Sequence, residues 1–236
     1  MKTSKTFTVE LAILMALLLL TAAIAVPIYC RPFYYAHIGP LGLVERTGLT
    51  EDEIRTAYDE MLDYSTDLGD TVEFSTGVLA WSENGKGHFT DVRGLFHLDL
   101  WVLCTCVGIL LGQSALTLGG RLPRPAPILG RGPAFWAGAG LGGAFLLVGA
   151  LASLNFDVAF VVFHALFFPG KTNWLFDPET DQIINILPQE FFRNCAILIL
   201  AILVLGCTAL ILSDLLHKRQ AQASMKKSQA KNRKTS

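Results

Sequence analysis

Charged side chains are scarce in this sequence. Only 17% of its 236 residues are Asp, Glu, Lys or Arg, whereas 52% are hydrophobic. A typical soluble domain has about 25% charged residues and a smaller apolar share. The composition therefore excludes an ordinary soluble globular domain and indicates an integral membrane protein.

The chain also lacks the residue spacings that mark metal, redox or nucleotide sites. Its five cysteines lie inside or at the ends of apolar runs, and no HExxH or paired CxxC spacing is present. A glycine spacing of the dinucleotide-binding type, Gly138, Gly140 and Gly143, lies in an apolar run with no strand before it. We interpret Gly138 and Gly142 instead as contact points between membrane helices, and we expect no metal and no cofactor.

Four apolar runs reach the length of about 20 residues that crosses a bilayer. They divide the chain into segments 1–30, 31–94, 95–118, 119–134, 135–156, 157–192, 193–215 and 216–236. Segment 1–30 contains the first span, and 95–118, 135–156 and 193–215 are the others. We expect an all-α membrane protein with four transmembrane helices and a small, mostly helical extracellular cap at 31–94.

Acidic residues are absent from three of the segments outside the spans. Residues 1–7, 119–134 and 216–236 contain Lys and Arg but no Asp or Glu, and seven basic residues occur from Lys218 onward. The positive-inside rule places these segments, and both termini, in the cytoplasm. The tail favours anionic membrane lipids as its partner over nucleic acid, and segments 31–94 and 157–192 are then outside.

Several local structures can be predicted in the outer segments. Thr50 and Glu53 have the spacing of a capping box, so a helix should begin there and end near Asp67–Gly69. Residues 84–87, Asn-Gly-Lys-Gly, indicate a turn. The apolar run 133–168 would measure about 54 Å as one helix, so its outer end should project, bend or lie in the interface.

Two histidines stand out because the chain offers little else for chemistry. His88 lies in a short polar run, and His164 lies in the aromatic run 163–168, each just outside a predicted span. Imidazole can both accept and donate a proton near neutral pH. Taken alone, His88 is also compatible with a solvated loop residue, whereas an ionisable residue at span depth such as His164 indicates function.

The outer segments resemble the bacterial lipoprotein intramolecular transacylases. The resemblance rests on runs of residues in two regions and on the four-span layout, so it covers nearly the whole chain. The runs are His88-Phe89-Thr90-Asp91-Val92, Phe163-His164-Ala165-Leu166-Phe167-Phe168, Asn173-Trp174-Leu175-Phe176-Asp177-Pro178, Asp181 with Ile183-Ile184, and Pro188 with Phe191-Phe192. One departure from the family pattern is that Lys86-Gly87 precedes the first histidine and Phe89 follows it.

The resemblance implies an enzyme that moves the sn-2 acyl chain of an S-diacylglyceryl cysteine onto the α-amino group of the same cysteine. The product would be a lyso-form lipoprotein, and the partners would be diacylglyceryl-modified lipoproteins. The family's two catalytic histidines correspond to His88 and His164. The active site would then lie at the extracellular interface of a bacterial cell membrane.

The residue types suit this chemistry. One imidazole can accept a proton from the attacking amine, while the second acts as an acid or as an oxyanion donor. We expect a headgroup-level pocket around them, with Asp91 or Asp157 orienting a histidine. The substrate-binding residues that we predict are Tyr34, Tyr35, Trp81, Asp91, Arg93, Asp157, Asn173, Trp174, Phe176 and Asp177.

Two other classes of function remain open from the sequence. A non-enzymatic membrane protein for binding or gating would need the aromatic residues but not the histidines. An intramembrane hydrolase would release a fatty acid or a peptide instead of conserving the acyl chain. The mass of the substrate before and after reaction separates all three classes.

Overall fold

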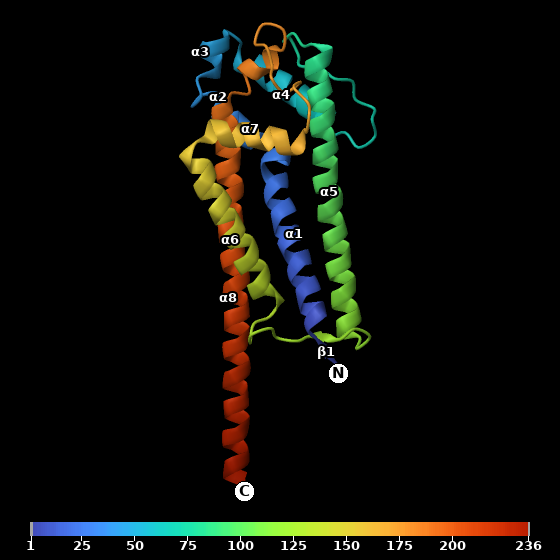
Figure 1. Cartoon of the computed structure of the whole chain (residues 1–236), viewed down its shortest axis with the longest axis vertical. Coiled ribbons are helices and arrows are strands. Elements are labelled where there is room, and N and C mark those ends of the chain that lie inside the picture. The colour runs from blue at the N-terminus through green and yellow to red at the C-terminus, as the bar shows by residue number, and fades with distance from the viewer. Residues whose placement is uncertain (1, 236) are drawn as a thin grey trace. The chain divides into compact units, whose positions relative to one another are not determined.

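The computed structural model describes residues 2–235 and is built mostly of helices (Figure 1). In chain order they are α1 (Lys5–Tyr29), α2 (Arg31–Ile38), α3 (Leu43–Thr47), α4 (Glu51–Thr66), α5 (Glu83–Leu118), α6 (Pro133–Leu154), α7 (Phe156–Phe167), the 3-10 helix η1 (Gln182–Asn185) and α8 (Gln189–Thr235). The two-residue strands β1 (Thr3–Ser4) and β2 (Arg124–Pro125) pair in parallel.

Four of the helices in the described part of the chain, α1, α5, α6 and α8, are long and apolar enough to cross a membrane. The predicted all-α class with four spans is therefore confirmed. Met1, the first residue of predicted segment 1–30, and Ser236, the last residue of predicted segment 216–236, lie outside the described residues. The side chains of 225–228 and 230–235 in the basic tail also lie outside them.

Contacts divide the chain into two compact units. The first contains Met1–Leu20, Leu103–Leu147 and Ala201–Ser236, and the second contains Thr21–Val102 and Val148–Leu200. The division falls within α1, α5, α6 and α8, because each of these helices has residues in both units. All the predicted site residues belong to the second unit.

The first unit is held together by close helix contacts and a few buried polar bonds. At Gly138 on α6, an added Cβ would lie 2.6 Å from the carbonyl oxygen of Cys207 on α8, so only glycine permits this approach. The predicted role of Gly138 and Gly142 as helix contacts is confirmed, since Gly142 also faces Cys207. The hydroxyl of Thr8 on α1 donates to the carbonyl of Ala126 at 2.6 Å.

The core of the second unit lies among the cap helices α2, α3 and α4, with η1 and the first turns of α5 and α8. The predicted capping box starts α4, since Thr50 accepts from the Glu53 amide and Glu53 bonds back to the Thr50 amide. The helix ends at Thr66, as predicted. One face of α4 is buried, including Ile54 and Tyr58, and burying this face stabilises a cap that would be marginal alone.

Helix α5 begins earlier than the sequence indicated, and the predicted turn at 84–87 is wrong. These residues form the first turn of a continuous helix that starts at Glu83. The amide of Gly85 donates to the hydroxyl of Ser82 at 3.0 Å, so Ser82 acts as the N-cap residue. His88 consequently lies on a helix, and the alternative of a solvated loop residue is excluded.

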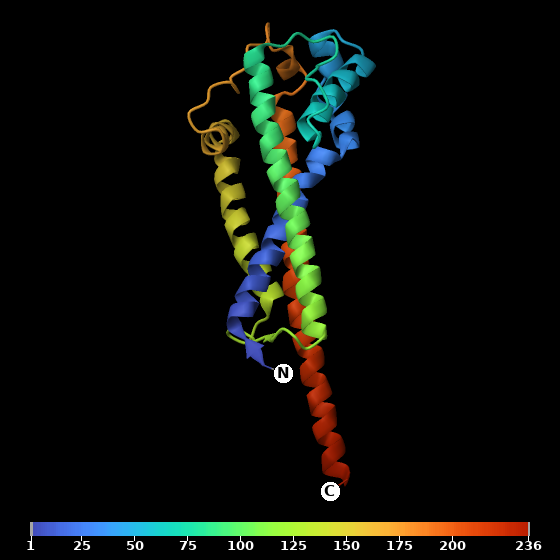
Figure 2. The same cartoon turned by 90° about the vertical axis from the view of Figure 1, so that its right-hand side faces the viewer.

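The long apolar run bends at Asn155, in agreement with one of the predicted outcomes. The Asn155 side chain accepts a hydrogen bond from the Val158 amide and caps a new helix, α7. Helix α7 runs across the direction of the first turns of α5 (Figure 1). Figure 2 shows α7 end-on, on the opposite side of α5 from the cap helices in that view. Helix α7 carries His164, whose ring lies near that of His88 on α5.

Candidate active site

His88 and His164 come together although the sequence separates them widely. Their ring centroids lie 5.8 Å apart, with an angle of 32° between the ring planes. Both residues are buried, each with 6% of its surface exposed. The predicted convergence of the two imidazoles is confirmed.

The orientation of His164 is set by its own helix. Its Nδ1 atom lies 2.8 Å from the carbonyl oxygen of Phe160, one turn earlier on α7. A carbonyl only accepts, so Nδ1 carries the proton and Nε2 keeps a lone pair in the neutral ring. Burial lowers the pKa of His164, and the bond to the Phe160 carbonyl partly offsets that effect. His164 thus presents a neutral, proton-accepting nitrogen.

His88 is held mainly by aromatic rings. Phe168 and Phe176 pack edge-on against its imidazole, with centroid distances of 5.0 and 5.4 Å. Its Nδ1 atom is buried and has no hydrogen-bond partner in the described part of the chain. Two positively charged imidazoles in such a buried place would repel each other, so the geometry favours at most one protonated ring.

Aromatic side chains complete the walls around His164. Trp174 stacks on its imidazole at 4.3 Å and 24°, and Phe160 lies at 4.3 Å from it. Phe89 stacks on Phe176 at 5.7 Å. These rings shield the imidazoles from water, so substrate atoms reach the histidines only when some of the rings move.

A polar group borders the histidine pair. Asp91, one turn after His88, pairs with the ammonium of Lys171 and accepts from the Asn173 amide at 3.1 Å. The Asn173 Oδ1 atom is buried and lacks a partner among the described residues. A Cβ at Gly87 would lie 3.7 Å from Asn173, so the amide rests against α5 beside His88.

Neither Asp91 nor Asp157 forms a hydrogen bond with an imidazole in the described contacts, contrary to the predicted orienting role. The Phe160 carbonyl occupies Nδ1 of His164. Asp157 instead accepts from Gln189 at 2.9 Å. It lines a separate cavity of about 220 Å³ with Phe156, Gln189, Glu190 and Arg193.

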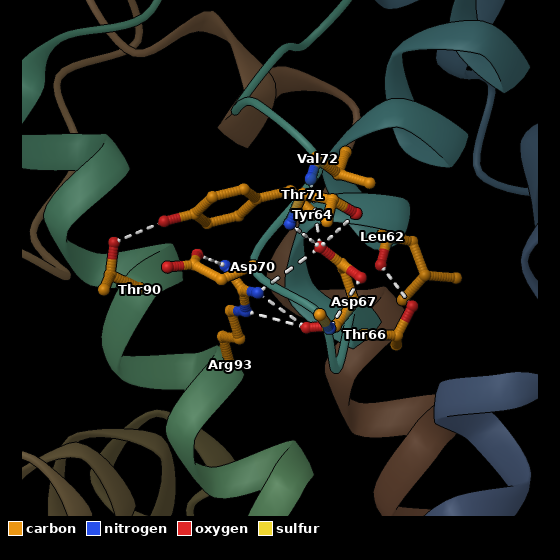
Figure 3. Close-up of polar contacts among 10 residues, drawn as sticks. Leu62, Tyr64, Thr66, Asp67, Asp70, Thr71, Val72, Thr90 and Arg93 are labelled. Atoms are coloured by element: carbon orange, nitrogen blue, oxygen red, sulfur yellow. Dashed lines mark hydrogen bonds and ion pairs between the residues drawn. The ribbon is translucent and has the colours of Figure 1, made fainter.

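Arg93 belongs to the scaffold of the cap (Figure 3). Its guanidinium donates to the carbonyl of Asp67 at 2.6 and 3.0 Å and pairs with Asp70 at 2.7 Å. The guanidinium also lies over the Tyr64 ring, with its central carbon 5.1 Å from the ring centroid. Three backbone N–H donors, from Gly69, Val72 and Thr71, lower the pKa of Asp67 to about 2. These bonds fix the loop after α4 to α5.

The remaining predicted residues lie farther from the histidines. Tyr34 is fully buried in the cap, stacks on Tyr58 at 3.7 Å and donates to the Ile186 carbonyl at 2.8 Å. Tyr35 donates to Asp59 at 2.7 Å. The structure therefore places both tyrosines in the cap core and not against the histidine pair.

Trp81 and Asp177 lie at the edge of the aromatic cluster. Trp81 packs edge-on against Phe74 at 5.3 Å, and Phe74 stacks on Phe89 at 5.4 Å. Asp177 is exposed and accepts from the Glu179 amide at 2.9 Å, as expected of a turn residue. Trp81 is therefore joined to the site through other rings, and Asp177 shapes the loop that carries Trp174 and Phe176.

Sequence reasoning did not single out Phe160, Phe168, Lys171 or Asp181 as site residues. The two phenylalanines lie one turn on either side of His164, a spacing that was available as a signal. Lys171 and Asp181 act through contacts with residues 80 and 99 positions away. No local pattern reports such contacts.

No group of three or more His, Cys, Asp or Glu side chains in the described residues is arranged to hold a metal ion. The groups available for chemistry are two imidazoles in an apolar setting. Such a pair can remove a proton from an attacking group and supply one to a departing oxygen.

Comparisons with known proteins agree with this geometry. The model of the family "Lipoprotein intramolecular transacylase Lit" matches residues 9–192. The structure is similar to that of the membrane integral lipoprotein intramolecular transacylase Lit from Bacillus cereus, with a TM-score of 0.75 and 28% identity over 90% of this chain and 96% of that chain. A form of the same protein with a histidine-to-arginine substitution matches with a TM-score of 0.72 and 26% identity, covering 91% of this chain and 92% of that one. No curated protein sequence gives a significant match.

Proposed function

This chain belongs to the lipoprotein intramolecular transacylase family, and we propose that it moves the sn-2 acyl chain of an S-diacylglyceryl cysteine onto that cysteine's α-amino group. It is a membrane acyltransferase that acts by transacylation within lipoproteins. The observation that carries the detailed mechanism is the convergence of two buried imidazoles at 5.8 Å. The product would be a lyso-form lipoprotein.

His164 acts as the base in this proposal. Its Nε2 lone pair is free because Nδ1 is bonded to the Phe160 carbonyl. An α-ammonium has a pKa of about 8, so it first loses one proton to the solvent. The neutral amine then attacks the ester carbonyl, and His164 takes a second proton from the nitrogen as the N–C bond forms. The Phe160 bond also stabilises the imidazolium that forms, since it aligns a carbonyl dipole with the charge.

His88 stabilises the negative charge that develops on the ester carbonyl oxygen. An imidazole N–H at His88 can donate to the carbonyl oxygen as it becomes an oxyanion. The tetrahedral intermediate then expels the glyceryl oxygen, which takes the proton that His164 removed from the amine. One N–C bond forms and one O–C bond breaks, and no water is consumed. The substrate therefore keeps its mass.

The reaction needs no nucleophilic side chain from the protein because it is intramolecular. Amine and ester belong to one molecule, and well-oriented intramolecular reactions gain effective molarities of about 10⁵ to 10⁸ M. The protein's task is to fold the ester back onto the amine in a place shielded from water. The rings of Phe160, Phe168, Trp174 and Phe176 suit this task because they enclose both imidazoles.

Of the predicted substrate contacts, Asn173 is best supported by geometry. Its buried Oδ1 atom lacks a partner among the residues that the structure describes, and a buried unpaired acceptor is costly. The substrate ammonium or a peptide N–H would supply the missing donor. Trp174, Phe176 and Asp91 border the same space, whereas Tyr34, Tyr35, Trp81, Arg93, Asp157 and Asp177 would contribute through the fold or through more distant parts of the substrate.

The active site faces the outside of the cell in this proposal. The basic segments 1–7, 119–134 and 216–236 place both termini in the cytoplasm by the positive-inside rule. Segments 31–94 and 157–192, which carry the cap and the two histidines, are then extracellular. Lipoprotein substrates and membrane lipids would meet the site at the outer leaflet.

Mass spectrometry on a purified diacylated lipoprotein tests the function. Wild-type enzyme should leave the substrate mass unchanged while its amino terminus becomes unreactive toward an amine label. His88→Asn and His164→Asn should each lower the rate by at least about 100-fold, which is the usual scale for loss of an acid–base group.

His37→Asn is a matched control for these variants. His37 also bonds through Nδ1 to a carbonyl one turn earlier, that of Phe33 at 2.6 Å, but it lies in the cap. It should keep the wild-type rate. Release of free fatty acid would identify a hydrolase, and unchanged rates in both histidine variants would contradict the two-histidine mechanism.

A further inference from the structure

Asp181 is a buried carboxylate that the mechanism does not use. Only 4% of its surface is exposed. Its oxygens accept the amide of Ser82 at 2.8 Å and the hydroxyl of Ser82 at 2.9 Å. Ser82 is the N-cap residue of α5, so Asp181 satisfies the group that caps the helix bearing His88.

A second pair of bonds joins the same two segments. The Gln182 amide donates to the Ala80 carbonyl at 3.0 Å, and the Ala80 amide donates to Gln182 Oε1 at 2.9 Å. Together with the Asp181–Ser82 bonds, these contacts form what we call the α5 clasp. The clasp joins the loop that carries Trp174 and Phe176 to the start of α5.

Gly85 shows how closely the clasp fits. A Cβ added at Gly85 would lie 2.1 Å from Asp181 Oδ1 and 3.2 Å from the Phe176 ring. Such distances are impossible without movement of the carboxylate, so the first turn of α5 needs glycine here. The negative charge of Asp181 also lies at the positive end of the helix, where it is favourable.

The position of the His88 ring depends on the start of α5 more than the position of the His164 ring depends on the start of α7. His164 has a hydrogen bond to Phe160 that sets its ring. His88 Nδ1 has no partner within the described chain, so its placement follows from the α5 backbone and from Phe176, which contacts both Gly85 and His88. His88 lies one turn after Gly85 on a neighbouring face.

We propose that Asp181 is a positioning residue for the transacylation, acting through Ser82 and the first turn of α5 to hold His88 at its distance from His164. This inference rests on the proposed two-histidine function. Asp181 touches neither histidine in the described contacts and takes no part in proton transfer. Its effect is therefore on the geometry of the reacting groups.

Two substitutions remove the Asp181–Ser82 bonds of the clasp from opposite sides. Gly85→Ala displaces the Asp181 carboxylate by steric overlap, and Asp181→Ala deletes it. Each should lower kcat by about 100-fold, the effect of a misplacement of about 1 Å at a catalytic group, with KM changed less than about threefold. The double variant should be no worse than either single one, because both changes break the same contact.

Gly94→Ala is the matched control. Gly94 is on the same helix, but an added Cβ meets nothing within 4 Å. Its kcat should stay at the wild-type value. Asp181→Asn, which keeps the shape and one acceptor oxygen, should fall between the wild type and Asp181→Ala.

A readout that needs no turnover separates positioning from the function itself. Diethyl pyrocarbonate modifies accessible imidazoles, and peptide mass spectrometry reports His88 and His164 individually. Loss of the Asp181–Ser82 bonds should raise the modification rate at His88 about tenfold or more, in line with a lost local protection of about 1.4 kcal/mol, and leave the rate at His164 unchanged. Equal increases at both histidines, an unchanged His88, or losses of kcat that multiply in the double variant would each overturn the proposal. Failure of the proposed function would appear separately, as wild-type enzyme without transacylation.

Discussion

The two histidines differ in how each is held, although both are buried to the same degree. His164 carries a backbone hydrogen bond that selects one tautomer, whereas Nδ1 of His88 has no partner in the described part of the chain. A fixed tautomer suits a base, because the lone pair must face the amine before the reaction begins. A ring without a fixed partner can turn its N–H toward an oxygen whose position changes during the reaction.

The pH dependence of stability should report the burial of His164. Its pKa is lowered in the folded protein, so the unfolded chain binds this proton more readily. Stability is therefore lost as pH falls through about 6.5, the unperturbed value, toward the lowered folded pKa. Thermal unfolding in detergent between pH 7.5 and 5 should show a smaller loss for His164→Asn than for the wild type. Identical slopes would contradict this account.

Arg93 allows the predicted substrate contact to be weighed against the observed structural role. Arg93→Met should lower the free energy of unfolding by about 2 to 3 kcal/mol, since hydrogen bonds of a charged group to the Asp67 carbonyl are lost. KM should not change at a temperature where the variant is folded. Arg55→Met is the matched control, because its exposed pair with Glu51 should contribute less than about 1 kcal/mol. A raised KM for Arg93→Met alone would favour substrate binding.

At the scale of elements, the start of α7 decides the direction of His164. Asn155 interrupts the long apolar run and caps the new helix. Asn155→Ala should cost about 1 kcal/mol of helix stability, and because α7 carries His164, kcat should fall by up to about fivefold. Thr50→Ala removes the equivalent cap of α4 and should lower the unfolding temperature without changing kcat. Equal effects of the two variants on kcat would show that α7 has no special role.

Local sequence signals predicted the elements whose causes are local. The capping box at Thr50 and Glu53 and the apolar runs of the four spans depend on neighbouring residues, and each is present. The turn expected at residues 84–87 failed because two glycines normally weaken a helix. In the structure a carboxylate 99 positions away stabilises this helix start. Local sequence patterns, which extend over about ten residues, do not indicate a contact at that separation.

In the candidate site, too, some features could be predicted from the sequence and others could not. The approach of His88 and His164 followed from their shared place outside the spans and from the family resemblance. Tyr34 and Tyr35 were expected in the pocket because aromatic residues gather at the interface, but composition does not tell a core ring from a pocket ring. Their hydroxyls bond to Ile186 and Asp59 inside the cap, and burial raises the pKa of Tyr34.

At the scale of the whole molecule, chemistry and membrane topology must agree. A diacylated lipoprotein has its ester groups at headgroup depth and its peptide in the water phase. Each of these positions fits a site bordered by an apolar helix with exposed Val162 and Leu166 on one side and by polar residues such as Asp91 and Lys171 on the other. The acyl chains can then stay in lipid while the amine reaches the ester.

The predicted orientation can be tested with two cysteine positions in a cysteine-free variant. Leu175 lies in the segment between α7 and η1 and is 60% exposed, and Leu129 lies between β2 and α6 and is 87% exposed. If the histidine-bearing segments are extracellular, a membrane-impermeant maleimide should label Leu175→Cys in intact cells and leave Leu129→Cys unlabelled until the membrane is opened. Transacylation by both variants would show that the labelled protein is folded. The opposite labelling pattern would place both imidazoles on the cytoplasmic side, where the basic segments should be, and would contradict the assignment of the outer leaflet as the place of reaction.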